Sequence, residues 1–141
     1  MSDGNRYRIL IADDDPNIRI ALRAALEAEG FEVLDVANGR QAIEWLLHVS
    51  VDLAILDLAM PHFDGLEVLS ELRLVRGTSL PPVLILTAYD SVTAAMEAAR
   101  RGAVGFLSKP ITPDALRDAV QNAISQRQSA GEGDQGENYL G

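Results

Sequence analysis

The sequence contains no cysteine and only two histidines among its 141 residues. Disulfide bonds, thiolate metal sites and cysteine nucleophiles are therefore excluded, and two histidines are too few for a histidine-built metal site. No segment approaches the roughly 20 consecutive apolar residues that a membrane-spanning helix needs. The first residues also lack the apolar core of a signal peptide, so we expect a cytoplasmic protein without a membrane partner.

Basic residues are also scarce, since 12 lysines and arginines stand against 21 acidic residues and give a formal net charge of -9. Such a surface repels nucleic acid unless a local basic patch overrides it, and the longest basic run is the pair Arg100 and Arg101. We therefore expect no nucleic-acid partner. Hydrophobic residues make up 48% of the chain, which is ordinary for a soluble globular domain with its own core.

Short apolar runs alternate with helical patterns along the chain. The apolar runs lie at 7–12, 31–37, 52–56, 82–86 and 104–107. Each is followed by a segment with apolar residues at helical spacing, and the second such segment, 40–48, is expected to place Trp45 on its buried side. In the first, the positions i, i+3, i+4, i+7 and i+8 hold Ile18, Ala21, Leu22, Ala25 and Leu26.

This alternation predicts an α/β fold in which a parallel sheet carries helices on both faces. The predicted strands are uniformly apolar, as in 53–56 and 83–86, which is typical of strands covered on both sides. Right-handed crossovers place the carboxyl ends of all the strands at one edge of the sheet. Ligands of such folds bind at that edge, so the residues that follow the strands are the candidates for function.

The pattern also divides the chain. We expect a short N-terminal extension at 1–6 and a single domain at 7–126. From residue 127 the sequence is polar and rich in glycine, which predicts a disordered tail or the remnant of a linker at 127–141.

Polar residues follow four of the predicted strands. Asp13 and Asp14 follow the first strand, Asp57 the third, Thr87 the fourth and Lys109 the fifth. Oxygen ligands without histidine or cysteine indicate a hard cation, and a few carboxylates with room for water and phosphate oxygens favour magnesium over calcium. The sequence therefore predicts a magnesium site at this edge of the sheet.

The same residues suit the transfer of a phosphoryl group to a carboxylate. Asp57 would be the nucleophile, and an ionised carboxylate that attacks phosphorus needs no general base. The magnesium ion, the ammonium group of Lys109 and the hydroxyl group of Thr87 would meet the negative charge on the phosphoryl oxygens.

Four segments that contain these residues resemble the signature segments of response-regulator receiver domains in bacterial two-component systems. They occur in the family's order, each at the end of the right strand, and the resemblance extends over roughly residues 7–126, nearly all of the predicted domain. The segments are ILIADDDPNIR at 9–19, LAILDLAMPHFDG at 53–65, VLILTA at 83–88 and GFLSKP at 105–110.

The resemblance implies the family's fold, a flavodoxin-like, doubly wound sheet of five parallel strands in the order 2-1-3-4-5, with five helices. It implies that Asp57 accepts a phosphoryl group from the phosphohistidine of a histidine kinase or a histidine phosphotransfer protein. It also implies a Mg²⁺ site, for which Mn²⁺ is a plausible substitute, formed by Asp13, Asp14, Asp57 and the backbone carbonyl of Ala59.

Further roles follow from the same resemblance. Thr87 and Lys109 would bind the phosphoryl group, and the peptide bond between Lys109 and Pro110 would be cis. Thr87 and Phe106 would form a switch that changes the surface of the fourth helix, the fifth strand and the last helix. Residues two positions after the acceptor and the switch threonine, Ala59 and Tyr89, would tune the lifetime of the phosphorylated state.

The implied protein is a signalling phosphoacceptor that catalyses only its own phosphorylation and dephosphorylation, and not an enzyme in the ordinary sense. Its partner after phosphorylation would be an effector protein, an output domain absent from this chain, or a second copy in a phosphorylation-dependent homodimer. The alternative is a degenerate receiver that binds partners without phosphorylation.

Two other site types fit less well. The run Asp13-x-Asp15 resembles the start of a haloacid-dehalogenase-type phosphohydrolase, but Asn17 stands where that family has Thr or Val. The same run resembles an EF-hand loop, but Ile18 and Ala24 replace its required Gly and closing Glu. Asp15, which precedes Pro16, is better interpreted as a helix N-cap.

Overall fold

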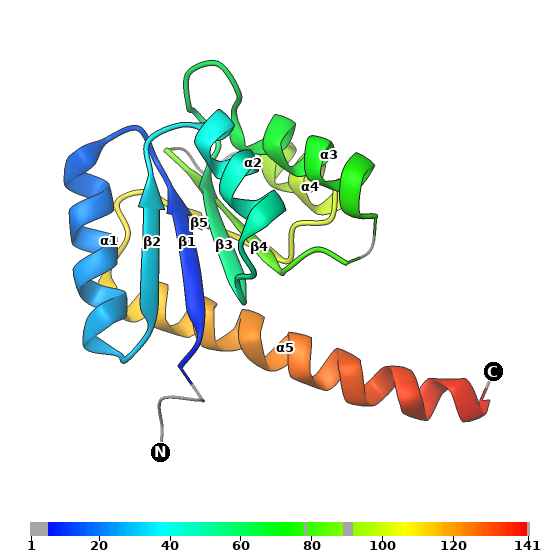
Figure 1. Ribbon diagram of the computed structural model, residues 1–141. Coiled ribbons are helices and arrows are strands. Elements are labelled where there is room, and N and C mark those ends of the chain that lie inside the picture. The colour runs from blue at the N-terminus through cyan, green and yellow to red at the C-terminus, as the bar shows by residue number, and fades with distance from the viewer. Residues whose placement is uncertain (1–5, 78, 89–91, 141) are drawn as a thin grey trace.

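The computed structural model describes residues 6–77, 79–88 and 92–140, with side chains for all of these except 92 and 127–140. Five strands alternate with five helices over this part of the chain (Figure 1). The elements are β1 (Arg8–Ala12), α1 (Pro16–Ala28), β2 (Glu32–Val36), α2 (Gly39–His48), β3 (Leu53–Asp57), α3 (Gly65–Arg76), β4 (Val83–Thr87), α4 (Val92–Arg100), β5 (Gly105–Ser108) and α5 (Pro113–Leu140).

All neighbouring strands are parallel, and their order in the sheet is β2-β1-β3-β4-β5. This confirms the predicted order. Strand β1 lies between β2 and β3, so that Ile11 is in register with Asp35 on one side and Ile55 on the other. Because every strand runs the same way, the residues that end β1, β3, β4 and β5 meet at one edge of the sheet.

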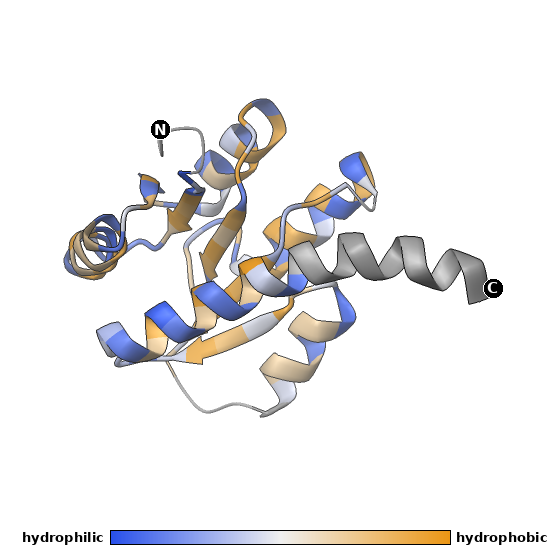
Figure 2. Cartoon of the chain, turned by 90° about the horizontal axis from the view of Figure 1, so that it is seen from below, coloured by the Kyte–Doolittle hydropathy of each residue, from blue (hydrophilic) through white to orange (hydrophobic). Residues whose placement is uncertain are grey.

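The sheet separates two hydrophobic cores. In β1, Leu10 and Ala12 pack on the side of α2, α3 and α4, whereas Ile9 and Ile11 pack on the side of α1 and α5. The other central strands alternate in the same way, as the side-chain period of two residues requires. Figure 2 shows the consequence for the helices, which are hydrophobic toward the sheet and hydrophilic on the outside.

The helices begin at residues that suit their positions. The Asp15 side chain accepts a hydrogen bond from the Asn17 backbone N–H, and Pro16 occupies the first turn of α1, as predicted. At the start of α3, the side chains of Asp64 and Glu67 each accept a hydrogen bond from the other's backbone N–H and form a capping box. These caps fix where each helix leaves the edge of the sheet.

The prediction that Trp45 lies on the buried side of α2 is wrong, because its side chain is 43% exposed. The fully buried positions of this helix include Ala42 and Leu46, which are one helical turn apart. Trp45 precedes Leu46 by one residue, and the helix turns about 100° per residue, so the indole lies at the margin of the buried stripe.

Helix α5 continues to Leu140, whereas the sequence predicted a disordered tail from residue 127. Extension of an existing helix adds one hydrogen bond for each residue fixed, without the cost of a new nucleus. A helix can therefore continue beyond the end of its apolar stripe. That stripe ends at Ile124. The domain boundary at 126–127 stays a prediction.

Within the described residues, no helix combines the length and the apolarity needed to cross a membrane.

Two leucines of α3 test how far the core determines stability. Leu72 is fully buried in the core on the side of α2, α3 and α4, and Leu74 is 82% exposed. We expect Leu72→Ala to lower the free energy of unfolding by about 2–5 kcal/mol, because it removes buried methyl groups and leaves a cavity. The matched change Leu74→Ala should alter it by less than about 0.5 kcal/mol.

Urea unfolding followed by circular dichroism measures both variants. Equal losses for the two substitutions would show that Leu72 is not the buried member of the pair and that α3 faces the sheet with another side.

Candidate functional site

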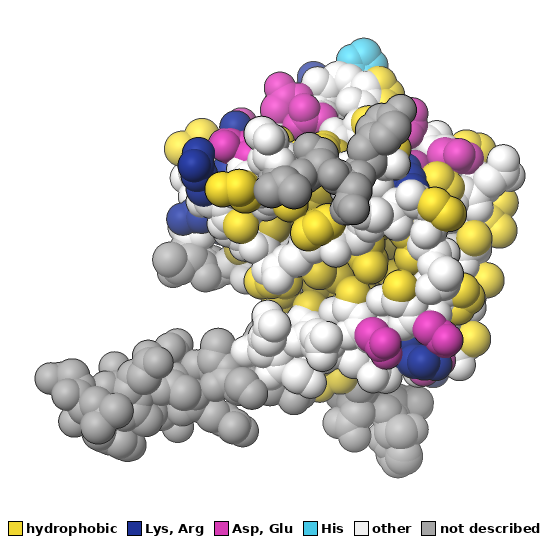
Figure 3. Space-filling view, turned by 180° about the vertical axis from the view of Figure 1, so that it is seen from behind, with side chains coloured by type: hydrophobic (Ala, Val, Ile, Leu, Met, Phe, Trp, Pro, Cys, Tyr) yellow, Lys and Arg dark blue, Asp and Glu magenta, His cyan; other side chains and the backbone are white. Residues whose placement is uncertain are grey.

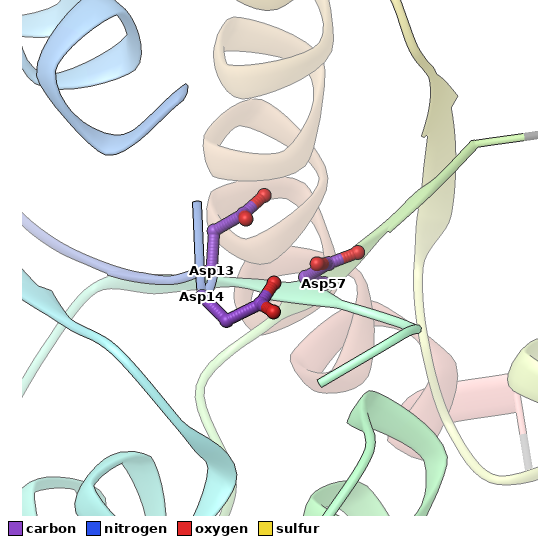
Figure 4. Close-up of side chains that lie close together, drawn as sticks. All are labelled: Asp13, Asp14 and Asp57. Atoms are coloured by element: carbon purple, nitrogen blue, oxygen red, sulfur yellow. The ribbon is translucent and has the colours of Figure 1, made fainter. Parts of the chain in front are cut away.

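Three carboxylates meet at the carboxyl edge of the sheet. Asp13 and Asp14 follow β1, and Asp57 is the last residue of β3. One carboxylate oxygen from each lies within 4.8 Å of the other two. Asp13 and Asp57 are buried and Asp14 is exposed, so the cluster is open to solvent on the side of Asp14. Figure 4 shows the Asp14 carboxylate directed toward Asp57.

Asp13 is held at both its backbone and its side chain. Its backbone N–H donates to the carbonyl oxygen of Val36 at the end of β2, over 3.2 Å. Its Oδ1 atom accepts a hydrogen bond of 2.9 Å from the Asp15 backbone N–H. The other carboxylate oxygen, Oδ2, is buried and accepts no hydrogen bond from the described residues. Its partner among the described residues is the ammonium group of Lys109, and a bound cation would add further positive charge beside this buried oxygen.

Lys109, which follows the edge strand β5, brings positive charge into the cluster. Its Nζ atom lies 3.0 Å from Asp13 Oδ2 and 3.3 Å from Asp57 Oδ1. The first contact is an ion pair without hydrogen-bond geometry, which is why Asp13 Oδ2 still lacks a hydrogen bond. Burial lowers the pKa of Lys109, but its contacts with the two carboxylates outweigh burial and raise it above the usual value.

The backbone around Lys109 fixes the direction from which its side chain enters. The Lys109 N–H donates to the carbonyl oxygen of Thr87 over 2.7 Å, which joins the ends of β4 and β5. The peptide bond between Lys109 and Pro110 is cis.

Asp57 is buried, with 2% of its surface exposed. Its Oδ1 atom also accepts a hydrogen bond of 3.3 Å from the Ala59 backbone N–H. Burial and the nearby charge of Asp13 raise the pKa of Asp57, while Lys109 and the Ala59 N–H act in the opposite direction. Gly65 packs against the same residue, since a Cβ atom there would lie 2.8 Å from the Asp57 carbonyl oxygen.

The remaining residues that the sequence predicted for the site differ in how exposed they are. Thr87 is buried at the end of β4, in register with Ser108 of β5. Phe106 is 43% exposed on β5. Ala59 is exposed in the loop after β3. Tyr89 lies outside the residues that the structure describes.

The donor set fits a hard divalent cation. Three carboxylates face each other, and among the described residues Lys109 is the side chain that forms ion pairs with them. The acidic charge therefore exceeds the basic charge, and all the available ligand atoms are oxygens, which suits magnesium or manganese rather than zinc.

Sequence reasoning missed two residues that support the site. One is Gly65, whose lack of a side chain allows α3 to start against the Asp57 backbone. The other is Arg19, whose Nη1 atom donates a hydrogen bond of 2.7 Å to the Asp13 carbonyl oxygen. Both lie within the segments that carry the family resemblance, but a hydrogen bond to a backbone carbonyl leaves no signal in residue periodicity.

The raised pKa of Asp57 leads to a prediction about stability without divalent cations. Stability linked to a carboxyl with a raised pKa is present below its usual pKa of 3.8 and is lost as the pH rises through the raised value. Asp57→Asn removes the ionised form, so at pH 7 it should increase the free energy of unfolding. The gain should shrink as the pH falls from 7 toward 4.

Urea unfolding in the presence of a chelator measures this difference at each pH. Asp118→Asn, which changes an exposed carboxylate of α5, is the control and should show no such trend. If Asp57→Asn lowered the stability at pH 7, the attraction of Lys109 for Asp57 would outweigh the cost of burial.

Comparison with known proteins gives matches over most of the chain. The family model "Response regulator receiver domain" matches residues 9–121. Regulatory protein AtoC of Escherichia coli (strain K12) is 38% identical over 117 residues, which cover 83% of this chain and 25% of AtoC. Sporulation initiation phosphotransferase F of Bacillus subtilis (strain 168) is 35% identical over 117 residues, which cover 83% of this chain and 93% of that protein.

A solved structure has the same fold. The crystal structure of a CheY-like response regulator receiver domain protein from Methanospirillum hungatei JF-1 matches with a TM-score of 0.81 and 26% identity, over 89% of this chain and 98% of that one. The chain thus spans about a quarter of the length of AtoC and nearly all of the Bacillus phosphotransferase. The agreement of family model, relatives and topology shows that this chain belongs to the response regulator receiver domains of two-component systems.

Proposed function

We propose that Asp57 is the phosphoacceptor of this receiver domain, and that its donor is the phosphohistidine of a histidine kinase or a histidine phosphotransfer protein. The observation that carries the proposal is the environment of the Asp57 carboxylate. It is buried at the end of β3, lies beside Asp13 and Asp14, and pairs with Lys109. Domains of this family act in signalling as phosphoacceptors, so the geometry supports a specific residue for an established type of reaction.

In the proposed reaction, a carboxylate oxygen of Asp57 attacks the phosphorus atom and the bond between phosphorus and the histidine nitrogen breaks. The electron pair of that bond returns to the imidazole, and an acyl phosphate forms on Asp57. The ammonium group of Lys109, 3.3 Å from Asp57 Oδ1, is close enough to pair with a phosphoryl oxygen. The hydroxyl group of Thr87 would donate a hydrogen bond to another.

Asp13, Asp14, Asp57 and the backbone carbonyl of Ala59 would hold a magnesium ion, which would neutralise charge on the phosphoryl oxygens when bound. Three carboxylates lie together with one ammonium group, that of Lys109, among the described residues, and this excess of negative charge supports a cation at this position. Manganese has the same preference for oxygen ligands and would substitute.

Thr87 and Phe106 would convert phosphorylation into a change of surface. Phe106 lines an apolar groove of about 310 Å³ together with Met96 of α4 and Val104. Hydrophobic side chains gather on this face of the molecule (Figure 3). If Thr87 moves toward the phosphoryl group and the Phe106 ring turns inward, the groove changes shape for the next partner. Ala59 and Tyr89 would set how fast water removes the phosphoryl group.

The partner of that surface would be an effector protein, an output domain outside this chain, or a second copy of the receiver. AtoC, of which the chain covers a quarter, is a regulatory protein, whereas the Bacillus relative of nearly the same length is a phosphotransferase. Each arrangement uses the same phosphoacceptor chemistry, so the proposal for Asp57 does not depend on the choice between them.

A receiver that works only by binding, without phosphorylation, is not favoured. The acceptor, the two acidic residues after β1, the threonine and the lysine are all present. The three carboxylates lie within 4.8 Å of one another, and Lys109 pairs with two of them.

Phosphorylation is tested by intact mass after incubation with a small-molecule phosphodonor. We expect the wild type to gain one phosphoryl group with magnesium and none with a chelator, and Asp57→Ala to gain none under either condition. Asp14→Asn should reduce the uptake by at least about tenfold, because it removes a cation ligand.

Asp15→Asn is the matched control for the acidic run, since asparagine caps a helix as well as aspartate does and Asp15 lies outside the carboxylate cluster. It should take up phosphate as the wild type does. A phosphoryl group found on Asp57→Ala would move the acceptor elsewhere, and no uptake by the wild type from either a small donor or a phosphorylated histidine kinase would refute the proposal.

The switch is tested by fluorescence, because Trp45 is the single tryptophan in the sequence. In a Trp45→Phe background, Phe106→Trp places an indole at the proposed switch position. Phosphodonor and magnesium should reduce its quenching by acrylamide roughly twofold as the ring becomes buried. Addition of Thr87→Ala should abolish this change in samples whose phosphorylation has been checked by intact mass. An unchanged quenching constant in a fully phosphorylated sample would contradict the switch.

A further inference from the structure

Arg19 connects helix α1 to the backbone of the acidic cluster. Its Nη1 atom donates a hydrogen bond of 2.7 Å to the carbonyl oxygen of Asp13. Its Nε atom donates a second hydrogen bond, of 3.2 Å, to Asp35 Oδ2 on β2. The side chain is 20% exposed, so both contacts are shielded from solvent in large part. One planar guanidinium group thus joins α1, β2 and the residue that follows β1.

The carbonyl that Arg19 holds belongs to the peptide unit between Asp13 and Asp14. The preceding peptide unit is also held, because the backbone N–H of Asp13 donates a hydrogen bond to the Val36 carbonyl oxygen. These two hydrogen bonds fix the orientation of the chain before and after the Asp13 Cα atom. Rotation of the peptide unit would move Asp14 directly, since the nitrogen of Asp14 is part of it.

Asp14 depends on this restraint more than its neighbours do. The Asp13 side chain is held by the Asp15 N–H and Lys109, and Asp57 by the Ala59 N–H and Lys109. Among the described residues, the Asp14 carboxylate forms no hydrogen bond or ion pair, and it is exposed. The position of its Cβ atom, and with it the range of directions open to its carboxylate beside Asp57 (Figure 4), is therefore set by its backbone.

We propose that Arg19 is a positioning residue of the cation site, which orients the Asp14 carboxylate by holding the carbonyl group of Asp13. The inference rests on the proposed function of the acidic cluster. Arg19 does not touch the cation or the phosphoryl group, and it acts through the peptide unit between the two aspartates. Loss of such an indirect support to a ligand weakens metal binding by about 10- to 100-fold in characterised sites.

Arg23 provides a matched control one turn later on α1. It pairs with the same Asp35 carboxylate and with Glu27, but it has no contact with Asp13 among the described residues. Arg23→Ala therefore removes an arginine from the same cluster without releasing the Asp13 carbonyl. Any effect that reflects only the stability of α1 and β2 should appear in both variants.

The experiment measures the dissociation constant of Mn²⁺ from the full chain by electron paramagnetic resonance of the free ion, without phosphorylation. We expect Arg19→Ala to weaken binding by roughly tenfold and Arg23→Ala to leave it within about twofold of the wild type. Arg19→Lys should restore part of the affinity, because one ammonium group can replace the hydrogen bond to Asp13 but not both contacts of the guanidinium.

Urea unfolding in a chelator accompanies each titration, and Arg19→Lys serves if Arg19→Ala does not fold. Wild-type affinity in folded Arg19→Ala, or an equal loss in Arg19→Ala and Arg23→Ala, would overturn the positioning role. If only Arg19→Lys folds, a loss no larger than that in Arg23→Ala would overturn it. If the wild type itself showed no saturable binding, or Asp14→Asn bound as tightly as the wild type, the cation site of the proposed function would fail together with this inference.

Discussion

The balance of charge among Asp13, Asp14, Asp57 and Lys109 is the constraint on which the rest of the site depends. Two of the carboxylates are almost completely removed from water, where an ionised group without partners is strongly disfavoured. The ammonium group offsets part of this cost by pairing with both. Removal of Lys109 would leave two buried carboxylates without their cation, so the lysine is the member of the site whose loss costs the most stability.

This charge balance also requires the sheet to be complete. The lysine follows β5, whereas the carboxylates that it contacts follow β1 and end β3, with β4 between them. The ion pairs therefore require β1, β3, β4 and β5 to lie side by side, so the site depends on the assembled sheet. Local structure at any one loop could not bring these groups together.

Much of this arrangement could be predicted from the sequence, because the strands are marked by uniformly apolar runs and each site residue ends or directly follows one. Parallel topology then brings Asp57, Thr87 and Lys109 to one edge without further information. Details that depend on the rotation of a helix could not be predicted in this way. Trp45 fits the helical stripe of α2 by spacing, yet it lies at the margin of the buried face.

Contacts to backbone atoms were also beyond the reach of residue patterns. The hydrogen bond from Arg19 to the Asp13 carbonyl depends on the direction of a peptide unit, and the close approach of Gly65 to the Asp57 carbonyl depends on where α3 begins. The extension of α5 beyond its apolar stripe has a similar origin, since backbone hydrogen bonds continue where side-chain patterning has stopped.

The division of the interior into two cores has a consequence for how this sequence can vary. No buried side chain belongs to both cores among the described residues, since those on the α1 and α5 side never pack with those on the α2, α3 and α4 side. A change of volume in one layer can therefore be compensated by a neighbour in the same layer, while the other layer keeps its sequence. The two layers can therefore vary separately in side-chain volume, and they are coupled through the strands, whose residues alternate between the two cores.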